Sequence, residues 1–478
     1  MDPSPAPPAI TLELALAATL LPALRRRLGT ALRRARPITL TWYDRDAGHG
    51  GEQLVTRGIA VVAWREARAE GWCAESLKVA IGAPAEPLGE ALFLAGLAEL
   101  DLPDNIAPVQ RFAGQLREGM ADGVALRLVT GQFDAAPDQA IARLTLRGPA
   151  GTTAMLAHTL STEFGLRMPT HSLAVEALML AGMDVPTRPL GAPNLPAGLS
   201  PPDAFAYAAS HLLGVLLLHA PRAAAGETGE PVHQMRVALR RLRSLSSLFR
   251  DAIACAEVAA LRPALKALAT ALGPARDWDV FLAETGGAVA TAFPDEPAVA
   301  ALVAAVETRR AAAYADLATM LAGPALTILA LQTAILVQTR PWPASAQDTA
   351  AFGATLLSRR RHQVTKRSAN PAHLPEAELH QLRLKAKRLR YAAEVFAPLS
   401  AGRPARKFLK RVAALQQALG LLNDGVVAAS LMHALADDGG TGLAGGMVRG
   451  FVAARASDAR AASARAWRRL RRAEVFWA

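Results

Sequence analysis

Cysteine is almost absent from this chain of 478 residues, which contains only Cys73 and Cys255. The two thiols lie far apart and lack the spacing of a metal site or a redox motif, so they predict a reducing, cytoplasmic compartment. Aromatic residues contribute only 5% of the chain, which leaves few rings for stacking on nucleic-acid bases. The ten histidines show no recurring ligand spacing, and the sequence therefore indicates neither a metal nor a cofactor.

Long uncharged hydrophobic runs are also scarce. The apolar run Leu14–Leu24 is short and precedes three arginines, which is not the pattern of a secretory signal. The later run Leu326–Val337 is too short to cross a bilayer and predicts a buried helix. We therefore expect no segment of transmembrane length and no association with a membrane.

Acidic residues are deficient only in the second part of the chain. Residues 1–200 carry 18 Lys and Arg against 20 Asp and Glu, whereas residues 201–478 carry 35 against 21. The whole net charge of +12 therefore comes from the C-terminal part. This asymmetry predicts that the C-terminal part binds an anionic partner and that the N-terminal part does not.

Residues 9–185 mix strand and helix patterns. Short β-branched or alternating segments predict strands at Ile38–Tyr43, Gly58–Trp64, Ala74–Val79, Val124–Thr130 and Ile141–Arg147. Helical patterns lie at Ala17–Arg34, Glu86–Leu100 and Gly151–Phe164. This mixture predicts an antiparallel α+β domain.

A proline-rich linker is expected at residues 186–202, and helical periodicity then runs through residues 203–478 with almost no strand pattern. Breaks at glycine and proline predict seven or eight helices arranged in bundles. The expected fold is therefore an α+β domain followed by an all-α domain.

The C-terminal part contains one basic motif twice, as VHQMRVALRRLR at Val232–Arg243 and as LHQLRLKAKRLR at Leu379–Arg390. Each copy places His, Arg, a basic residue and Arg within a wedge of roughly 80° on one helix. The first basic row is His233, Arg236, Arg240 and Arg243, and the second basic row is His380, Arg383, Lys387 and Arg390. Matches at the same offset of 147 residues extend over some 45 residues, which indicates a tandem duplication.

A charge run on one helix is usually a solvated face, and a lone histidine is usually a surface or capping residue. The repeated register favours a shared ligand instead, because solvent exposure imposes no register. Arginine pairs bidentately with phosphate, so the two rows together predict a surface for a long polyanion. The arginine neighbours should lower the pKa of each imidazole, whereas a bound phosphate should raise it.

A second repeated element reads LGPARDWDV at Leu272–Val280 and LGLLNDGVV at Leu419–Val427. Its glycines, Gly273 and Gly420, are expected to end helices or to permit a turn. Its acids, Asp277 and Asp424, are expected to cap the next helix or to fix neighbouring arginines, and capping is the favoured role.

Further cations extend the predicted anion site. Arg276 lies within the second element and is expected to reach the anion. Lys266, Lys410 and Arg411 are expected to enlarge the positive surface, although they have no basic counterpart at the repeat offset. The run Arg359–His362 and the arginines at 468–472 are equally consistent with basic helix ends.

The residues from 200 to 478 resemble the CHAD family, the conserved histidine α-helical domain. The resemblance is carried by HQMRVALRRLR, LGPARDWDV, HQLRLKAKRLRYAAEVF and the terminal Trp467, Phe476 and Trp477. It implies two pseudo-symmetric helical bundles whose basic rows face a central cavity that binds inorganic polyphosphate. The implied ligand-binding residues are His233, Arg236, Arg240, Arg243, Arg276, His380, Arg383, Lys387 and Arg390. The resemblance also implies association with polyphosphate granules and their proteins.

The N-terminal part resembles a CYTH domain, an antiparallel β-barrel that hydrolyses triphosphates with a divalent metal. The resemblance rests on the segment Thr11–Leu16, on TWYDRD at Thr41–Asp46, and on GIAVVAWRE followed by SLK. Of the CYTH catalytic residues only Glu13 and Lys78 clearly remain, and the strand that should supply acidic ligands carries arginines at 143 and 147. A divalent metal needs clustered carboxylates, so we expect a degenerate domain without catalytic residues.

Three functions are therefore considered. The first is non-catalytic binding of inorganic polyphosphate in a basic cavity. The second is a CYTH-type, metal-dependent triphosphatase assisted by the CHAD domain, against which the missing acids argue. The third is nucleic-acid binding, which the charge permits, but Tyr391 is the only aromatic residue that interleaves the basic motifs.

Overall fold

The computed structural model describes residues 8–45, 53–56, 58–66, 69–76, 106–185, 191–366, 371–400, 402–436 and 442–477. The chain forms two compact units. The first unit contains the described residues up to 190 together with Leu213–Leu218 and Gly323–Pro341. The second unit contains Gly191–Leu212, His219–Ala322 and Trp342–Ala478.

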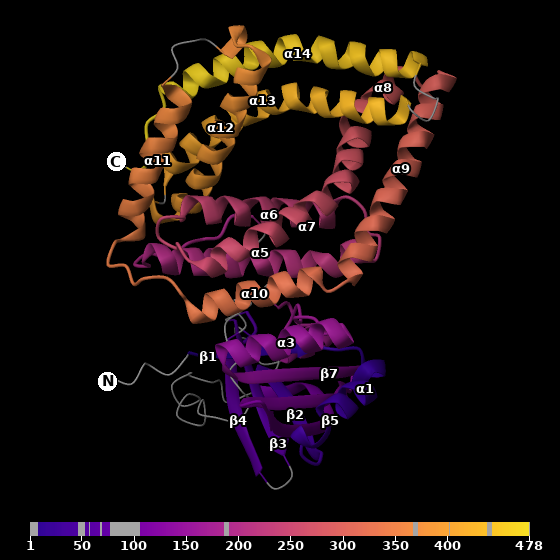
Figure 1. Cartoon of the computed structure of the whole chain (residues 1–478), viewed down its shortest axis with the longest axis vertical. Helices are drawn as coiled ribbons and strands as arrows, with labels where there is room; N and C mark the ends of the chain where they lie inside the picture. Colours follow the sequence, from indigo (N-terminus) through magenta and orange to yellow (C-terminus); the bar gives the residue numbers. More distant parts are fainter. Residues whose placement is uncertain are drawn as a thin grey trace. The chain divides into compact units, whose positions relative to one another are not determined.

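The first unit is built on a seven-stranded antiparallel sheet (Figure 1), which confirms the predicted α+β class. The strand order is β1-β7-β6-β5-β2-β3-β4, so β1 and β4 are the edges of the described sheet. The strands are β1 (Ala9–Ala15), β2 (Arg36–Arg45), β3 (Ile59–Glu66), β4 (Ala69–Ser76), β5 (Ile106–Ala121), β6 (Val124–Phe133) and β7 (Ala136–Pro149).

Alternating side chains give this sheet two different apolar faces. On one face Leu12, Leu126 and Leu144 are buried under α3 (Ala150–Phe164), in a core cluster that also contains residues of α10 (Ala325–Thr339). On the other face a cluster of aliphatic and aromatic residues packs against α4 (Leu173–Leu180). The sheet is therefore covered on both faces, as a two-layer or three-layer domain requires.

The sequence predictions for this unit are confirmed at β2, β3, β6, β7 and α3, and the strand predicted at Ala74–Val79 agrees with β4 over its described residues. The expected helix Ala17–Arg34 is reduced to α1 (Leu21–Leu28), because the chain turns at Gly29 with φ of 49°. Strand β5 and helix α4 were not predicted. The expected helix Glu86–Leu100 lies outside the described residues.

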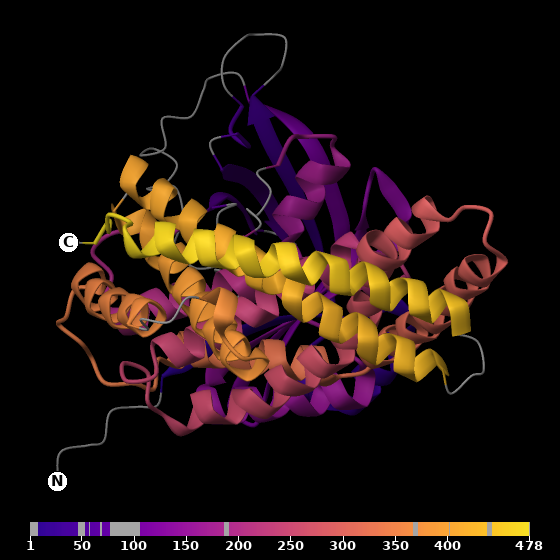
Figure 2. The same ribbon diagram turned by 90° about the horizontal axis from the view of Figure 1, so that it is seen from above.

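The helices of the second unit repeat with the offset found in the sequence. Shifting the bounds of the first four long helices by 147 residues reproduces, within a few residues, the starts of the last four. The first set is α5 (Pro201–Ala224), α6 (Glu230–Leu248), α7 (Ala256–Val280) and α9 (Pro297–Ala322). The second set is α11 (Thr349–Thr365), α12 (Glu376–Phe396), α13 (Arg403–Ala436) and α14 (Gly442–Arg471). The duplication thus covers whole helices, and α13 and α14 run side by side in Figures 1 and 2.

Helix α10 stands between the two repeats in sequence, yet it belongs to the first compact unit. It confirms the buried helix predicted at Leu326–Val337, and its residues Leu331 and Ala334 join the core cluster beneath α3. Its Gln338 pairs with the backbone of edge strand β1: Thr11 N–H donates to Oε1 and Nε2 donates to the Thr11 carbonyl, both at 2.9 Å. The amide therefore occupies hydrogen-bonding groups at the edge of the sheet, where Thr11 is buried. With α8 (Gly287–Ala292), the described part of residues 201–478 contains ten α-helices, more than the seven or eight predicted.

Two described helices are long and apolar enough to cross a membrane by length and composition, so the expected lack of such segments is wrong. Helix α5 has no Asp, Glu, Lys or Arg between Asp203 and Arg222, and 78% of its most apolar window is buried within the protein. The second is Arg403–Leu435, of which 31% is buried. The burial of α5 is typical of a core helix, whose apolar side chains face neighbouring helices.

The hydrogen bonds of the Gln338 amide should contribute measurably to the stability of the first unit. Replacing it in Gln338→Ala leaves the Thr11 N–H and carbonyl of β1 without their partner, and we expect the free energy of unfolding to fall by about 1–2 kcal/mol. Urea denaturation followed by the fluorescence of the sheet tryptophans measures this change. The exposed Gln347→Ala is the control and should shift the midpoint little; equal midpoints for both variants would contradict the role of Gln338.

Candidate functional site: a cationic cavity between two repeated helices

The first basic row lies on α6, which begins at Glu230 with Pro231 in its first turn, a position that suits proline because its missing N–H needs no partner. Val232, Met235 and Leu239 recur at helical spacing and are buried, so they fix the face that packs inward. His233, Arg236 and Arg240 are partly buried, whereas Arg243 is exposed.

The second basic row lies on α12, whose Leu379, Leu382 and Leu389 are buried in the same way. Arg383, Lys387 and Arg390 are partly buried, and His380 is exposed. Both basic rows thus lie on amphipathic helices of the same design, as the repeated motif predicts.

Members of both rows line one cavity of about 520 Å³ in the second unit. Arg240 comes from α6, and Arg383 and Lys387 come from α12. Six further lining residues were not predicted: Glu284, Gln416, Gln417, Gly420, Leu421 and Arg455. Four cationic side chains therefore face the cavity with a single carboxylate, that of Glu284.

Two lining residues have buried polar atoms without a hydrogen-bond partner in the described structure. These atoms are Nε of Arg240 and Oε1 of Gln416. The guanidinium of Arg240 lies over the ring of Tyr391, with Cζ 5.5 Å from the ring centroid. The stacking holds the arginine plane while leaving N–H groups available to an anion.

Arg236 is held by the second repeated element. Its Nη1 donates to the Leu272 carbonyl at 3.1 Å, and its Nη2 lies 3.5 Å from Oδ1 of Asp277. A Cβ at Gly273 would lie 3.5 Å from the same Nη1, which is an ordinary van der Waals distance. In the first repeat, the basic row and the second repeated element therefore contact each other through Arg236.

This contact corrects two predictions. Gly273 and Gly420 do not end helices, because α7 continues to Val280 and α13 to Ala436. Asp277 is likewise not a cap: it lies inside α7 and pairs with Arg236, which was the less favoured of the two expected roles. The side chain of Asp424, its counterpart in the second repeat, lies outside the described residues.

The pKa of the His233 imidazole is lowered, first by burial and then by the positive charge of Arg276, with smaller effects of Arg240 and Arg236. This direction confirms the expected effect of arginine neighbours, although burial is the larger cause. Burial also lowers the pKa of Arg236, and Arg240 and Arg276 act in the same direction. The row is therefore a set of like charges whose repulsion an anion would relieve.

A carboxylate joins the two basic helices beside the cavity. Glu394 of α12 accepts from Nη2 of Arg241 on α6 at 2.9 Å and from Nε of Arg390 on its own helix at 2.7 Å. Arg390 is thus engaged in a structural ion pair. Glu394 was not predicted, and its spacing of four residues after Arg390 was the sequence signal that could have identified it.

The other nine predicted residues, including His233, Arg236 and Arg390, are not among those that line this cavity. Arg243, Lys266, His380 and Lys410 are exposed, and Arg276 and Arg411 are partly buried. These six residues add positive charge to the second unit but do not line the cavity.

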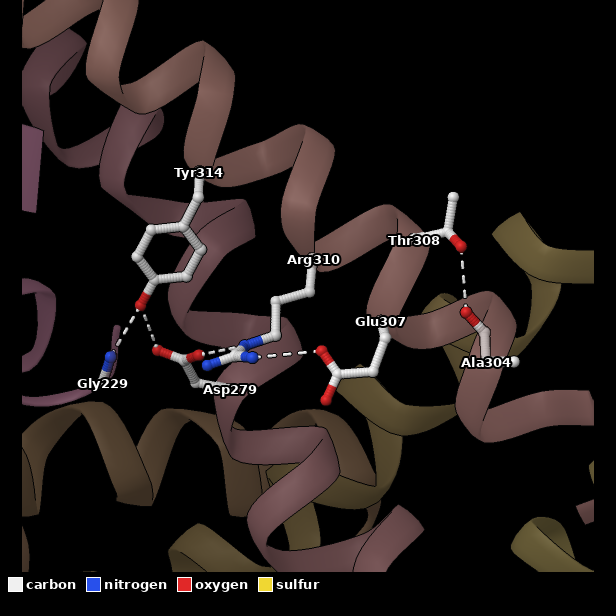
Figure 3. Close-up of polar contacts among 7 residues, drawn as sticks. All are labelled: Gly229, Asp279, Ala304, Glu307, Thr308, Arg310 and Tyr314. Atoms are coloured by element: carbon white, nitrogen blue, oxygen red, sulfur yellow. Dashed lines mark hydrogen bonds and ion pairs between the residues drawn. The ribbon is translucent and has the colours of Figure 1, made fainter. Parts of the chain in front are cut away.

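The start of α6 is fixed by a buried polar cluster of Asp279, Arg310, Tyr314 and Gly229 (Figure 3). The Gly229 N–H donates to the Tyr314 hydroxyl, which donates to Oδ2 of Asp279, both at 2.8 Å. Nε of Arg310 donates to Oδ1 of the same carboxylate at 2.7 Å. Burial and the Asp279 carboxylate raise the pKa of Tyr314 to about 12. Because the His233 N–H donates to the Gly229 carbonyl, this cluster sets where the first basic row begins.

The polar groups of the N-terminal sheet neutralise one another. Arg143 forms an ion pair with Glu176 and lies 3.5 Å from Oε1 of Glu13. Burial raises the pKa of both carboxyls, and Arg143 opposes the increase. The described part of the chain contains no group of three or more His, Cys, Asp or Glu suited to a metal ion. Lys78, the other residue retained from the CYTH pattern, lies outside the described residues.

Comparison with known proteins supports the resemblance in the helical part. The CHAD domain family matches residues 207–433. The chain is similar to the crystal structure of the CHAD domain from the plant Ricinus communis, with 30% sequence identity and a TM-score of 0.51, over 61% of this chain and 98% of that one. It also matches PptA from Streptomyces chartreusis, with 19% identity and a TM-score of 0.45, over 57% of this chain and all of that one. A comparison with curated proteins gives no match.

The cluster around Tyr314 gives a prediction for the stability of the second unit. Tyr314→Phe keeps the ring but leaves the Gly229 N–H and Oδ2 of Asp279 without a partner, so we expect the free energy of unfolding to fall by about 1–3 kcal/mol. Chemical denaturation followed by circular dichroism measures the loss. Tyr207→Phe, at a ring that is 42% exposed, is the matched control, and an unchanged midpoint for Tyr314→Phe would refute the proposed contribution.

Proposed function

The chain belongs to the CHAD domain family, and on this basis we propose that it binds inorganic polyphosphate without hydrolysing it. The observation that carries the proposal is the cavity of the second unit, where Arg240, Arg383, Lys387 and Arg455 face a single carboxylate. The resemblance noted in the sequence implies polyphosphate as the ligand. A cytoplasmic location and association with polyphosphate granules belong to the same proposal.

The chemistry of the cavity suits a chain of phosphates. Arginine donates planar pairs of N–H groups that match phosphate oxygens, and lysine supplies a compact charge. The cations come from both repeats, so a ligand with several linked charges can satisfy α6 and α12 together. A single small anion would leave part of this repulsion unrelieved.

Nucleic-acid binding is less well supported. Base stacking needs accessible aromatic faces, but Tyr391 is 5% exposed and its ring is covered by Arg240. The triphosphatase alternative is also less well supported, because Arg143 occupies the place where the CYTH resemblance calls for acidic metal ligands and neutralises Glu13 and Glu176. These ion pairs would have to break before the carboxylates could hold a divalent cation.

Removing charge from both rows tests the proposed site. Arg240→Ala/Arg383→Ala removes one lining arginine from each row and should weaken binding of long-chain polyphosphate by at least about tenfold, since each charge-assisted contact contributes about 1.5–3 kcal/mol. Titration at several salt concentrations should also give a smaller salt dependence, by analogy with counterion release from nucleic acids. Arg33→Ala/Arg65→Ala removes the same charge from exposed positions of the first unit and should bind like the unmodified protein. Equal losses of affinity in the two double variants would contradict the site assignment.

The pKa of His233 predicts a pH dependence of binding. Burial and the charge of Arg276 lower the imidazole pKa of the free protein below its ordinary value, and a bound phosphate raises it because the anion stabilises the protonated ring. Affinity should therefore increase as the pH falls through the pKa of the complex and level off below the pKa of the free protein. Calorimetric titrations between about pH 5 and 8 measure this, and His233→Gln should flatten the profile. An unchanged profile in that variant would remove His233 from the binding site.

A further inference from the structure

A second group of arginines lies on the second unit, outside the set that lines the cavity. This outer arginine cluster consists of Arg250, which follows α6, Arg359 and Arg360 on α11, and Arg388 on α12. Arg250, Arg359 and Arg388 are exposed, and Arg360 is partly buried. In the described part of the chain, none of the four forms an ion pair with a carboxylate.

Three phenylalanines that pack against one another connect the segments of the cluster. The ring centroids of Phe249 and Phe352 are 5.4 Å apart, those of Phe249 and Phe396 are 5.7 Å apart, and those of Phe352 and Phe396 are 6.2 Å apart. Each ring belongs to a segment that carries cluster arginines: Phe249 adjoins Arg250, and the other two rings lie about two turns from Arg359 and Arg388. The arginines are therefore presented by a rigid scaffold.

The cationic groups of the cluster act on one another. The pKa of the Arg360 guanidinium is lowered first by burial and then by Arg388, Arg359 and Arg250. Its Nη1 donates to Gln363 Oε1 at 3.4 Å, a long contact to a neutral group that does not compensate a positive charge. The adjacent Arg361 is different, since its Nη2 donates to the carbonyls of Arg471 and Ala473 and thereby caps the end of α14.

The duplicated fold does not require these charges. At the repeat offset, Arg359 and Arg360 correspond to the buried Leu212 and Leu213, and Arg250 corresponds to Ala397. Arg388 corresponds to Arg241, which Glu394 neutralises. The position equivalent to Glu394 in the first repeat is a serine, at residue 247, so the fold repeats the arginine without repeating its acid.

The cluster and the cavity share helix α12. Lys387 lines the cavity, and Arg388 is the next residue, about 100° further round the same helix. We propose that the outer arginine cluster is a second phosphate-binding site, which takes the continuation of a polyphosphate chain that occupies the cavity. This proposal rests on the proposed function and extends it: chains too short to leave the cavity engage only the cavity residues, and long chains engage both sites.

Two ligands of different length distinguish the two proposed sites in a binding experiment. Arg359→Ala/Arg388→Ala changes two arginines, both exposed, so folding should be retained. We expect its affinity for tripolyphosphate to change less than about twofold and its affinity for long-chain polyphosphate to fall about tenfold. The slope of log affinity against log salt for the long chain should decrease by roughly 1.5, because two phosphate contacts are lost. Arg33→Ala/Arg65→Ala is again the charge-matched control.

The outcomes distinguish this proposal from the proposed function. Unchanged affinity for the long chain, or equal losses for both ligands, would overturn the second site while leaving the cavity assignment intact. Retained long-chain binding by Arg240→Ala/Arg383→Ala, together with its loss in Arg359→Ala/Arg388→Ala, would overturn the cavity assignment instead. No binding of either ligand by the unmodified protein would refute both. Single-stranded DNA at equal phosphate concentration is the comparison ligand, and a preference of the cluster for DNA would contradict polyphosphate as its occupant.

Discussion

Repulsion between like charges governs the arrangement of the helical unit. Four cationic side chains face a cavity with one carboxylate, and their mutual repulsion is unfavourable in the free protein. Of these four, Arg240 is supported by the ring of Tyr391. Among nearby arginines that do not line the cavity, Arg236 is held by Asp277 and the Leu272 carbonyl, and Arg241 and Arg390 are held by Glu394. Asp277 and Glu394 do not line the cavity either, so they hold arginines without neutralising the surface that an anion meets. Preorganisation of this kind favours a polyanion because its binding relieves repulsion already present in the free protein.

Much of this arrangement was readable from the sequence, because helical period and repeat register depend on local spacing. The two basic rows, the duplication and the buried helix at α10 follow from patterns that need no knowledge of tertiary structure. The role of Asp277 does not, since a carboxylate three residues after a Gly-Pro pair suits a cap as well as an ion pair. The prediction for Gly273 is wrong for a related reason. Tertiary packing continues α7 through Gly273 and Pro274 to Val280 and overrides the low helix propensity of these two residues. Which row members line the cavity depends on how the helices cross, which no local pattern records.

The sequence predicts the N-terminal sheet with the same limits. Its strands with clear alternation were predicted, but β5 was not, because polar residues alternate irregularly along it. Arg143 could be recognised in the sequence as a basic residue on a strand, whereas its partner Glu176 comes from α4, which the sequence does not predict. Arg143 also lies 3.5 Å from Oε1 of Glu13, so both carboxylates are engaged by the arginine. Helix α10 and its Gln338 further pair this sheet with a segment that lies between the helical repeats in sequence, so the first unit is not continuous along the chain.

The most direct measurement of the central claim is a crystal structure of the protein with bound polyphosphate of defined length. The account predicts continuous phosphate density in the cavity, with oxygen atoms within hydrogen-bonding distance of Arg240 on α6 and of Arg383 and Lys387 on α12. Density confined to the first unit, or to a surface that touches neither basic helix, would contradict it.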